Sequence, residues 1–226
     1  MRLLLVVNNI SDVSFLEELA AQQKFAPNPN CNYLYEGQIL HHEVNILTTG
    51  YGAFQTGYKL SKVLSTNKYH LALKLSIANA YKPEHNPGTA LNIINEKPGD
   101  FGVFEMGEWR DLYDQQLLKS EDMPHVRGGF INMTNAYMNI FMPFKKAVGI
   151  TVNTLCQNGL VEMRSAKYKA DVETADGLTF AYTCLFEKQT YYHLAFVVKN
   201  LTTEEQDIEL VKQKMNEVFI DLINKL

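Results

Sequence analysis

The chain has 226 residues, a formal net charge of −4, and 46% hydrophobic against 20% charged residues. This length fits a single α/β domain with a substantial core, and the composition excludes disordered and collagen-like chains. Lysine and arginine are scattered and outnumbered by acidic residues. We therefore expect no nucleic acid partner held by phosphate neutralisation.

The cysteines and the first residues bear on the cellular compartment. Cys31, Cys156 and Cys184 are widely spaced and form no CxxC pattern, which predicts neither a disulfide framework nor a zinc site. The apolar run at residues 3–7 ends at Asn8-Asn9 and is too short for a signal peptide or a membrane span. We expect a cytoplasmic protein with no membrane partner and no metal.

The N-terminal part predicts a strand, a helix and a loop. Residues 3–7 are continuously apolar, as in a strand covered on both faces. Residues 13–23 carry apolar side chains at helical spacing. Asp12 stands at the start of this helix, where the usual role of an aspartate is an N-cap. Residues 26–32 hold two prolines and several asparagines, so we expect a loop there.

A glycine turn follows the next two strands. Residues 33–40 and 43–48 predict strands, and residues 54–64 predict a helix. Between them lies Thr49-Gly-Tyr-Gly-Ala, a turn that lets backbone amides approach an anion or a sugar. The GxGxxG fingerprint is not met because Gln55 occupies its third glycine position, and close helix–strand packing would explain the glycines equally well.

The middle of the chain predicts strands and then an irregular excursion. Residues 69–78 and 89–95 read as buried strands, and alternation of strands with helices indicates an α/β fold. Residues 97–146 predict an excursion of the kind that often forms a lid or an oligomer contact. Its aromatic and methionine cluster at residues 137–144 fits either packed core or a binding surface.

The C-terminal part again alternates strands and helices. The expected strands are residues 148–155, 170–174 and 191–200, and the expected helices are residues 160–168 and the segment after Gly177. A last helix should begin at Thr203, since Gln206 completes a capping box, and its apolar stripe should cover the sheet. These elements predict one α/β domain over residues 1–226, with a mixed central β-sheet flanked by helices.

Residues 170–184, ADVETADGLTFAYTC, change from strand to helix periodicity at Asp176-Gly177. Ligands in open α/β sheets lie just beyond the carboxyl ends of strands, so a carboxylate at this position can reach ligand hydroxyls. The alternative role of Asp176 is a helix N-cap.

The order of polar sites at strand ends resembles the nucleoside phosphorylase and nucleosidase superfamily. These sites are Asp12, the Gly50-Tyr51-Gly52 turn, Asp176 and Asn200. Within the superfamily the chain resembles futalosine hydrolase, a menaquinone-pathway nucleosidase related to methylthioadenosine/adenosylhomocysteine nucleosidase. The most specific motif is Val172-Glu-Thr-Ala-Asp-Gly, against V-E-x-M-E-G in the family. Similar segments include residues 1–7, 47–52, 76–79, 87–93 and 149–154.

The resemblance implies a nucleoside phosphorylase-like fold and hydrolysis at the ribose C1′, with an oxocarbenium-like transition state and a purine leaving group. It implies that Asp12 activates the water, that Asp176 accepts the ribose hydroxyls and that Asn200 contacts the base. An amide at the last position favours a 6-oxopurine. The other implied substrate contacts are Asn8, Tyr51, Ile77, Ala78, Asn79, Cys156, Gln157 and Ala175.

The resemblance also implies the partners. The substrate is a small purine nucleoside, no cofactor is required, and the chain forms a homodimer or higher homo-oligomer in which one subunit completes its neighbour's pocket. We expect the cluster around residues 141–144 to supply the contact, with the packed-core interpretation still open.

Several positions depart from the family pattern. Asp12 and Asp176 replace glutamates one methylene longer, and misplacements of about 1 Å can cost about 10²-fold in rate. Further departures are Ser76 and Asn79 for glycines, Ala175 for methionine, Phe196 for a supporting arginine and Lys199 for a small hydroxyl residue. Two functions are therefore compatible with the sequence: a hydrolytic purine nucleosidase, or a protein of the same fold that binds a nucleoside-like ligand or a partner without efficient catalysis.

Overall fold

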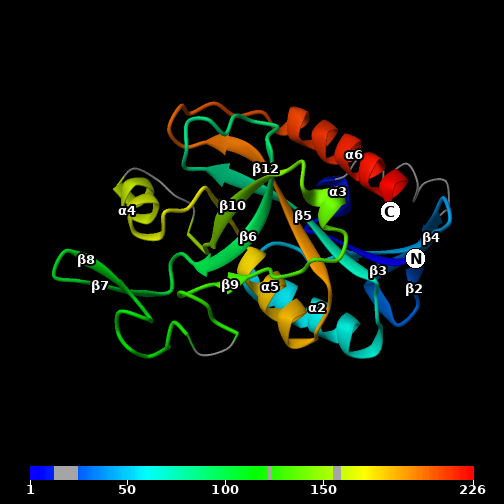
Figure 1. Cartoon of the computed structure of the whole chain (residues 1–226), viewed down its shortest axis with the longest axis horizontal. Helices are drawn as coiled ribbons and strands as arrows, with labels where there is room; N and C mark the ends of the chain where they lie inside the picture. Colours follow the sequence, from blue (N-terminus) through cyan, green and yellow to red (C-terminus); the bar gives the residue numbers. More distant parts are fainter. Residues whose placement is uncertain (13–24, 122–123, 155–158) are drawn as a thin grey trace.

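The computed structural model describes residues 1–12, 25–121, 124–154 and 159–226. A central mixed β-sheet dominates it, with strands in the order β11-β10-β6-β12-β5-β1-β4-β3-β2 and β9 beside β6 (Figure 1). The strands are β1 (Arg2–Val7), β2 (Phe25–Asn28), β3 (Cys31–Ile39), β4 (His42–Thr48), β5 (Leu71–Ala80), β6 (Ala90–Pro98), β9 (Phe130–Ile131), β10 (Lys145–Thr151), β11 (Val172–Thr174) and β12 (Tyr191–Asn200).

The sheet closes on itself at one end. Strands β4, β1, β5 and β12 run parallel, and β12 meets β6 antiparallel. β6, β10 and β11 run parallel to one another. β11 then returns to pair antiparallel with the end of β5, so that Glu173 lies opposite Asn79. This closure brings the end of β11 to the carboxyl ends of β5 and β12.

Helices cover both faces of the sheet. The helices are α2 (Ala53–Thr66), α3 (Met138–Phe141), α4 (Gly159–Tyr168), α5 (Gly177–Phe186) and α6 (Ile208–Lys225), with a 3₁₀ turn at Ile10–Asp12. α2 and α5 lie on one face and α6 on the other (Figure 1). The two-layer cover explains the continuous apolar run of β1, because alternate side chains along a strand point to opposite faces. The prediction of a single-domain α/β fold with a mixed sheet is confirmed.

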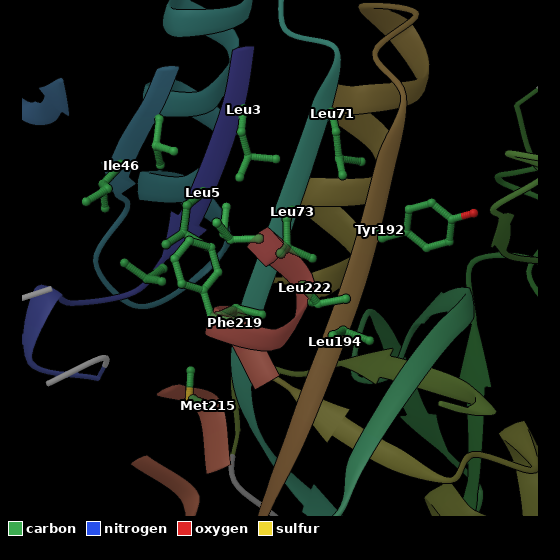
Figure 2. Packing of buried hydrophobic residues seen from close by; sticks show 14 of the residues in the cluster. Leu3, Leu5, Ile46, Leu71, Leu73, Tyr192, Leu194, Met215, Phe219 and Leu222 are labelled. Carbon is green, nitrogen blue, oxygen red and sulfur yellow. The ribbon is translucent and has the colours of Figure 1, made fainter. Parts of the chain in front are cut away.

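The α6 face forms the largest apolar cluster. Met215, Phe219 and Leu222 of α6 pack against Leu5 and Leu73 of the sheet, as Figure 2 shows. All five side chains are fully buried, and each buried side chain of this size contributes about 1.5–3 kcal/mol. The predicted apolar stripe of the last helix is confirmed.

Two predicted boundaries are wrong. Part of residues 26–32 is a strand rather than a loop. Pro27 is tolerated in β2 because this strand lies at the edge of the sheet, where the missing proline N–H breaks no hydrogen bond of the ladder. The last helix begins at Ile208 instead of Thr203, and Asp207 caps it by accepting from the Leu210 amide. Residues 201–207 instead form a turn whose amides at Thr202 and Thr203 donate to Asn200.

The excursion at residues 97–146 holds some regular structure. A hairpin, β7 (Gly102–Glu105) and β8 (Glu108–Asp111), stands out to one side (Figure 1). In the aromatic cluster, Phe141 is buried and its ring stacks on Tyr192 with centroids 3.7 Å apart. Met138 and Met142 of the same cluster are exposed. The core interpretation thus describes Phe141, and the surface interpretation describes the methionines.

Some expectations fall outside the described residues. The helix expected at residues 13–23 and the substrate contacts Cys156 and Gln157 are among them. Across the described parts of the chain, no helix is long and apolar enough to cross a membrane.

Candidate functional site

The carboxyl ends of the parallel strands meet at one edge of the sheet, where α/β proteins bind ligands. A cavity of about 410 Å³ opens there, within the usual range for small-molecule sites. It is lined by Tyr51, Ile77, Ala78, Asn79, Val152, Glu173, Thr174, Ala175, Val198 and Ile208. Five of the predicted substrate contacts, Tyr51, Ile77, Ala78, Asn79 and Ala175, are thus brought together by the fold.

The glycine turn after β4 forms one wall of the site. Gly50 and Gly52 both have positive φ, of 76° and 94°, a conformation that favours glycine. The Gly50 amide donates to the carbonyl of Asn8 at 2.8 Å, and the Asn8 side-chain amide donates back to the Gly50 carbonyl at 2.9 Å. Reciprocal bonds therefore fix the turn against the end of β1 and place Tyr51 over the cavity.

Asp176 follows β11 and is buried, with 1% of its surface exposed. Its Oδ2 accepts hydrogen bonds from Asn8 Nδ2 at 3.0 Å, Thr56 Oγ1 at 2.5 Å and Lys74 Nζ at 2.9 Å. Its Oδ1 is buried and has no hydrogen-bond partner among the described residues. The carboxylate is held by one oxygen and keeps the other free.

The side chain of Asp176 does not cap the helix that it precedes. Thr174 Oγ1 accepts from the Gly177 amide at 3.1 Å, and Thr151 Oγ1 accepts from the Leu178 amide at 2.7 Å. Because two threonines satisfy these N-terminal amides, Asp176 is left for the buried contacts above. The N-cap alternative for Asp176 is therefore wrong.

Lys74 is a site residue that the sequence analysis missed. It lies in the middle of β5 between Leu73 and Leu75, has no exposed surface, and forms an ion pair with Asp176. A lysine is almost never fully buried unless it is paired. The sequence feature that could have identified Lys74 was its position as a single lysine within the apolar run of a predicted strand.

Asp12 is also buried, with 6% of its surface exposed. Its Oδ2 accepts from the Asn9 amide at 2.8 Å, and its Oδ1 accepts from the Tyr51 hydroxyl at 3.4 Å. Burial raises the pKa of Asp12, while the bonds from Asn9 and Tyr51 and the charge of Lys74 act in the lowering direction. Burial also raises the pKa of Tyr51, with added contributions from the charges of Asp12 and Asp176. Tyr51 thus joins Asp12 to the cavity that it lines.

Glu173 is the carboxylate in the cavity lining, to which neither Asp12 nor Asp176 belongs, and it too was missed as a site residue. Its Oε1 accepts from Asn79 Nδ2 at 3.0 Å, and its Oε2 accepts from the Tyr81 hydroxyl at 2.5 Å. Arg164 of α4, itself 2% exposed, lies 3.4 Å from Oε2. The signal was the glutamate of the Val172-Glu motif, which sequence reasoning used only for the resemblance.

Asn200 is fully buried, and its side chain binds the chain itself. Nδ2 donates to the carbonyls of Lys82 at 2.9 Å and His85 at 3.1 Å, and Oδ1 accepts from the Thr202 and Thr203 amides. Asn200 does not line the cavity, whereas Val198 does. A base contact by Asn200 needs these bonds to exchange, and it stays a prediction.

The two bulky residues that depart from the family pattern, Phe196 and Lys199, do not fill the cavity. Phe196 is buried in the apolar cluster under α6, and Lys199 pairs with Glu204 at 2.5 Å. Neither side chain belongs to the cavity lining. Neither residue therefore blocks the cavity at the strand ends.

A second buried polar chain crosses the sheet beneath the start of α5. Ser76 Oγ lies 2.6 Å from His193 Nε2, and His193 Nδ1 lies 2.6 Å from Glu96 Oε1. The three come from neighbouring strands β5, β12 and β6, and all are at least 98% buried. A Cβ on Gly177 would meet Glu96 Oε1 at 2.4 Å, so glycine after Asp176 is required for this close packing.

Two other features carry less weight. A larger hollow of about 910 Å³ lies between the β7–β8 hairpin and α4, but none of the predicted site residues lines it. In the described part of the chain, no cluster of three or more histidine, cysteine or acidic residues is placed to hold a metal ion.

Comparisons with known proteins address the fold. Neither family models nor curated protein sequences match the chain. Among solved structures, the methylthioadenosine/S-adenosylhomocysteine nucleosidase of Campylobacter jejuni superposes with a TM-score of 0.80 at 14% identity, with both chains covered completely. A futalosine hydrolase mutant of Helicobacter pylori gives 0.78 at 10% identity, covering 100% and 98% of the two chains.

A third structure, the nucleosidase of Colwellia psychrerythraea in complex with adenine, gives a TM-score of 0.79 at 12% identity, covering 100% of this chain and 96% of that one. At such identities the likeness concerns the backbone path and not the side chains of the site. The chain therefore shares the fold of these methylthioadenosine/S-adenosylhomocysteine nucleosidases and of this futalosine hydrolase.

Proposed function

We propose that this protein is a nucleosidase-type hydrolase that cleaves the N-glycosidic bond of a purine nucleoside with water. The observation that carries the proposal is the cavity at the strand ends, with Tyr51, Asn79 and Ala175 in its lining and the buried acids Asp12 and Asp176 beside it. A cavity of about 410 Å³ is large enough for a nucleoside and a water.

The geometry suggests a role for each acid. Asp12 is held by Asn9 and Tyr51 and would orient and deprotonate the attacking water. Asp176 would accept a ribose hydroxyl through Oδ1, the oxygen without a partner in the described chain. Burying an unpaired carboxylate oxygen is costly, and a ligand hydroxyl would remove that cost.

We further propose a 6-oxopurine nucleoside such as futalosine as the substrate, and a menaquinone-pathway role in the cytoplasm. This finer proposal comes from the amide at position 200 and from the resemblance of Val172-Glu-Thr-Ala-Asp-Gly. No cofactor takes part in it. Direct contact of Asn200 with the base requires its bonds to the carbonyls of Lys82 and His85 to rearrange.

A product assay tests the proposal. Futalosine, inosine, adenosine and methylthioadenosine are incubated with the protein, with and without phosphate, and the free base is quantified by chromatography. We expect base release that is independent of phosphate and lost in Asp12→Asn and Asp176→Asn. Absence of product from all four nucleosides at high protein concentration would exclude hydrolysis of these substrates.

A second function, binding of a nucleoside without efficient turnover, is favoured by one observation. Asp176 Oδ2 already accepts three hydrogen bonds, one of them from the Lys74 ammonium. Because the charge of Lys74 offsets that of the carboxylate, Asp176 would stabilise a positive charge on the ligand less strongly. Thermal stabilisation by a nucleoside without product would support this function, and measurable turnover would exclude it.

We also propose that the protein is a homodimer or higher homo-oligomer. Large aromatic side chains are exposed on two neighbouring helices, Phe54 and Tyr58 on α2 and Tyr182 and Phe186 on α5. Large exposed apolar patches are typical of interaction sites. Light scattering after size exclusion tests the state, and a monomer at micromolar concentration would contradict it.

A further inference from the structure

We propose that Lys74 is a positioning residue that sets the charge of the site, so that the cavity selects an uncharged ribose over a positively charged sugar. This inference rests on the proposed function, because it takes the occupant of the cavity to be a nucleoside. It concerns the balance between binding and cleavage, for which the strand-end acids alone give no account.

The charge of Lys74 is not screened by solvent. Lys74 has no exposed side-chain surface and Asp176 has 1%, with Nζ and Oδ2 2.9 Å apart. Salt and water screen buried charges far less than exposed ones. The charge of Lys74 therefore offsets that of Asp176 at any group that lies near the pair.

The pair adjoins the cavity. Thr174 and Ala175, which directly precede Asp176, line it. Asn8 joins the Asp176 carboxylate to the glycine turn that carries Tyr51, because its amide donates both to Asp176 and to Gly50. A ligand between Tyr51 and Ala175 would therefore lie beside an acid that adjoins the cavity without lining it and whose charge is already paired.

The carboxylate in the lining, Glu173, also has a buried cation beside it. Glu173 has Arg164 3.4 Å away, and both side chains are at least 98% buried. Arg164 also lies 3.5 Å from Asp100. Glu173 in β11 and Asp176 after it are thus each paired with a buried cation, although Arg164 is shared between Glu173 and Asp100.

The chemistry of glycoside cleavage gives this charge balance a consequence. Positive charge develops on the ribose ring as the bond to the base breaks, and carboxylates speed the reaction by being more attractive to that charge than to the neutral substrate. A buried ammonium on the same carboxylate removes part of that difference. Binding of the neutral nucleoside is affected much less, since the nucleoside brings no charge.

The test compares two ligands of the same shape and different charge. The dissociation constants of inosine and of its aza-sugar analogue, whose ring nitrogen is protonated, are measured by calorimetry for the wild type and for Lys74→Gln. Glutamine removes the charge and keeps a donor for Asp176. We expect the preference for the cationic analogue to rise about tenfold or more in Lys74→Gln, with inosine binding little changed. Where turnover is measurable, kcat should rise while KM stays constant.

Further variants separate charge from structure. Lys74→Met, with no donor, should raise the preference as well and serves if the glutamine variant does not fold. In Lys74→Met/Asp176→Asn both charges are gone, so the preference should return to the wild-type value. Lys82→Gln is the matched control, because Lys82 forms an ion pair with Asp171 and does not line the cavity, and it should leave the preference unchanged.

The outcomes distinguish the inference from the proposed function. One outcome is that inosine binds while the ratio of the dissociation constants of inosine and the cationic analogue is the same in the wild type and the Lys74 variants. In that case the proposed role of Lys74 is wrong and the nucleoside site stands. If neither compound binds any of these proteins, the nucleoside site falls, and the role of Lys74 falls with it. A rise in preference that is equal in Lys82→Gln would also overturn the inference.

Discussion

The two faces of strand β5 carry different kinds of residue. Leu71, Leu73 and Leu75 point to the α6 face and belong to its apolar cluster. Lys74 and Ser76 alternate with them and point to the α5 face, where both enter buried polar contacts. Both faces exclude solvent equally, so the difference lies in what is buried and not in how much.

Strand β12 repeats this division. Tyr192, Leu194 and Phe196 join the α6 cluster, while His193 faces α5 and bridges Ser76 and Glu96. Apolar packing stabilises a fold through a force that has no preferred direction. A buried ion pair adds little net stability to the fold and requires one specific geometry. The comparison indicates that both faces contribute apolar packing, and that only the α5 face of these two strands adds the buried polar groups that fix the charge beside the site.

Removing a large side chain from the α6 face should have the largest effect on stability. Phe219 is fully buried in the cluster of Figure 2. Phe219→Ala should lower the free energy of unfolding by about 3–5 kcal/mol, because a cavity is left in well-packed surroundings. Urea denaturation measures the loss. Nucleoside affinity below the unfolding transition should not change, and a selective loss of binding would contradict the division between the faces.

Breaking the ion pair on the α5 face should cost about 3 kcal/mol, the lower part of the range for a buried unpaired charge. The variant is Lys74→Met, which leaves Asp176 with Asn8 and Thr56 as donors. The double variant Lys74→Met/Asp176→Leu should recover this loss or exceed the wild type, since apolar replacements of buried pairs are often neutral or stabilising. A double variant as unstable as Lys74→Met alone would show that the α5 face needs its charges to fold.

Sequence reasoning reached the α6 face more completely than the α5 face, for a physical reason. Periodicity records which side chains avoid water, so the strands and the apolar stripe of α6 could be predicted from local pattern. The glycine turn followed from the positions of strand ends, and the five predicted cavity residues followed from the family resemblance. The buried cluster could not follow, because Lys74 and Asp176 lie 102 residues apart and meet only through the order of the strands.

Local rules also gave a wrong role in one place. Asp176 precedes a helix, which favours an N-cap, but Thr151 lies in another strand and supplies a cap instead. Only the pairing of β10 with β11 brings that threonine to the start of α5. The sequence could show where an acid stands and not which donors the fold would offer it.

Loss of one hydrogen bond to Asp176 should have a smaller effect. Thr56 Oγ1 donates to Oδ2 at 2.5 Å from a fully buried position. Thr56→Val keeps the shape and removes the donor, and it should cost about 2 kcal/mol, as expected for a hydrogen bond to a charged group. Thr56→Ser keeps the hydroxyl and is the control. Equal losses in the two variants by urea denaturation would show that packing, and not the bond, matters at this position.

The smallest expected effect is the pH dependence from Asp12. Burial raises its pKa in the folded protein, so between the unfolded and the folded pKa the native state binds more protons than the unfolded state. Stability from this group is then greatest at low pH and falls as pH rises from about 4 through the folded pKa, by less than about 1.4 kcal/mol for each pH unit of the window. The difference in unfolding free energy between the wild type and Asp12→Asn, measured across pH, should decrease over this window and become flat above it. Hydrolysis should change in the opposite sense, because the proposed base acts as the carboxylate, and a rate that falls as pH rises through the same window would exclude Asp12 from that role.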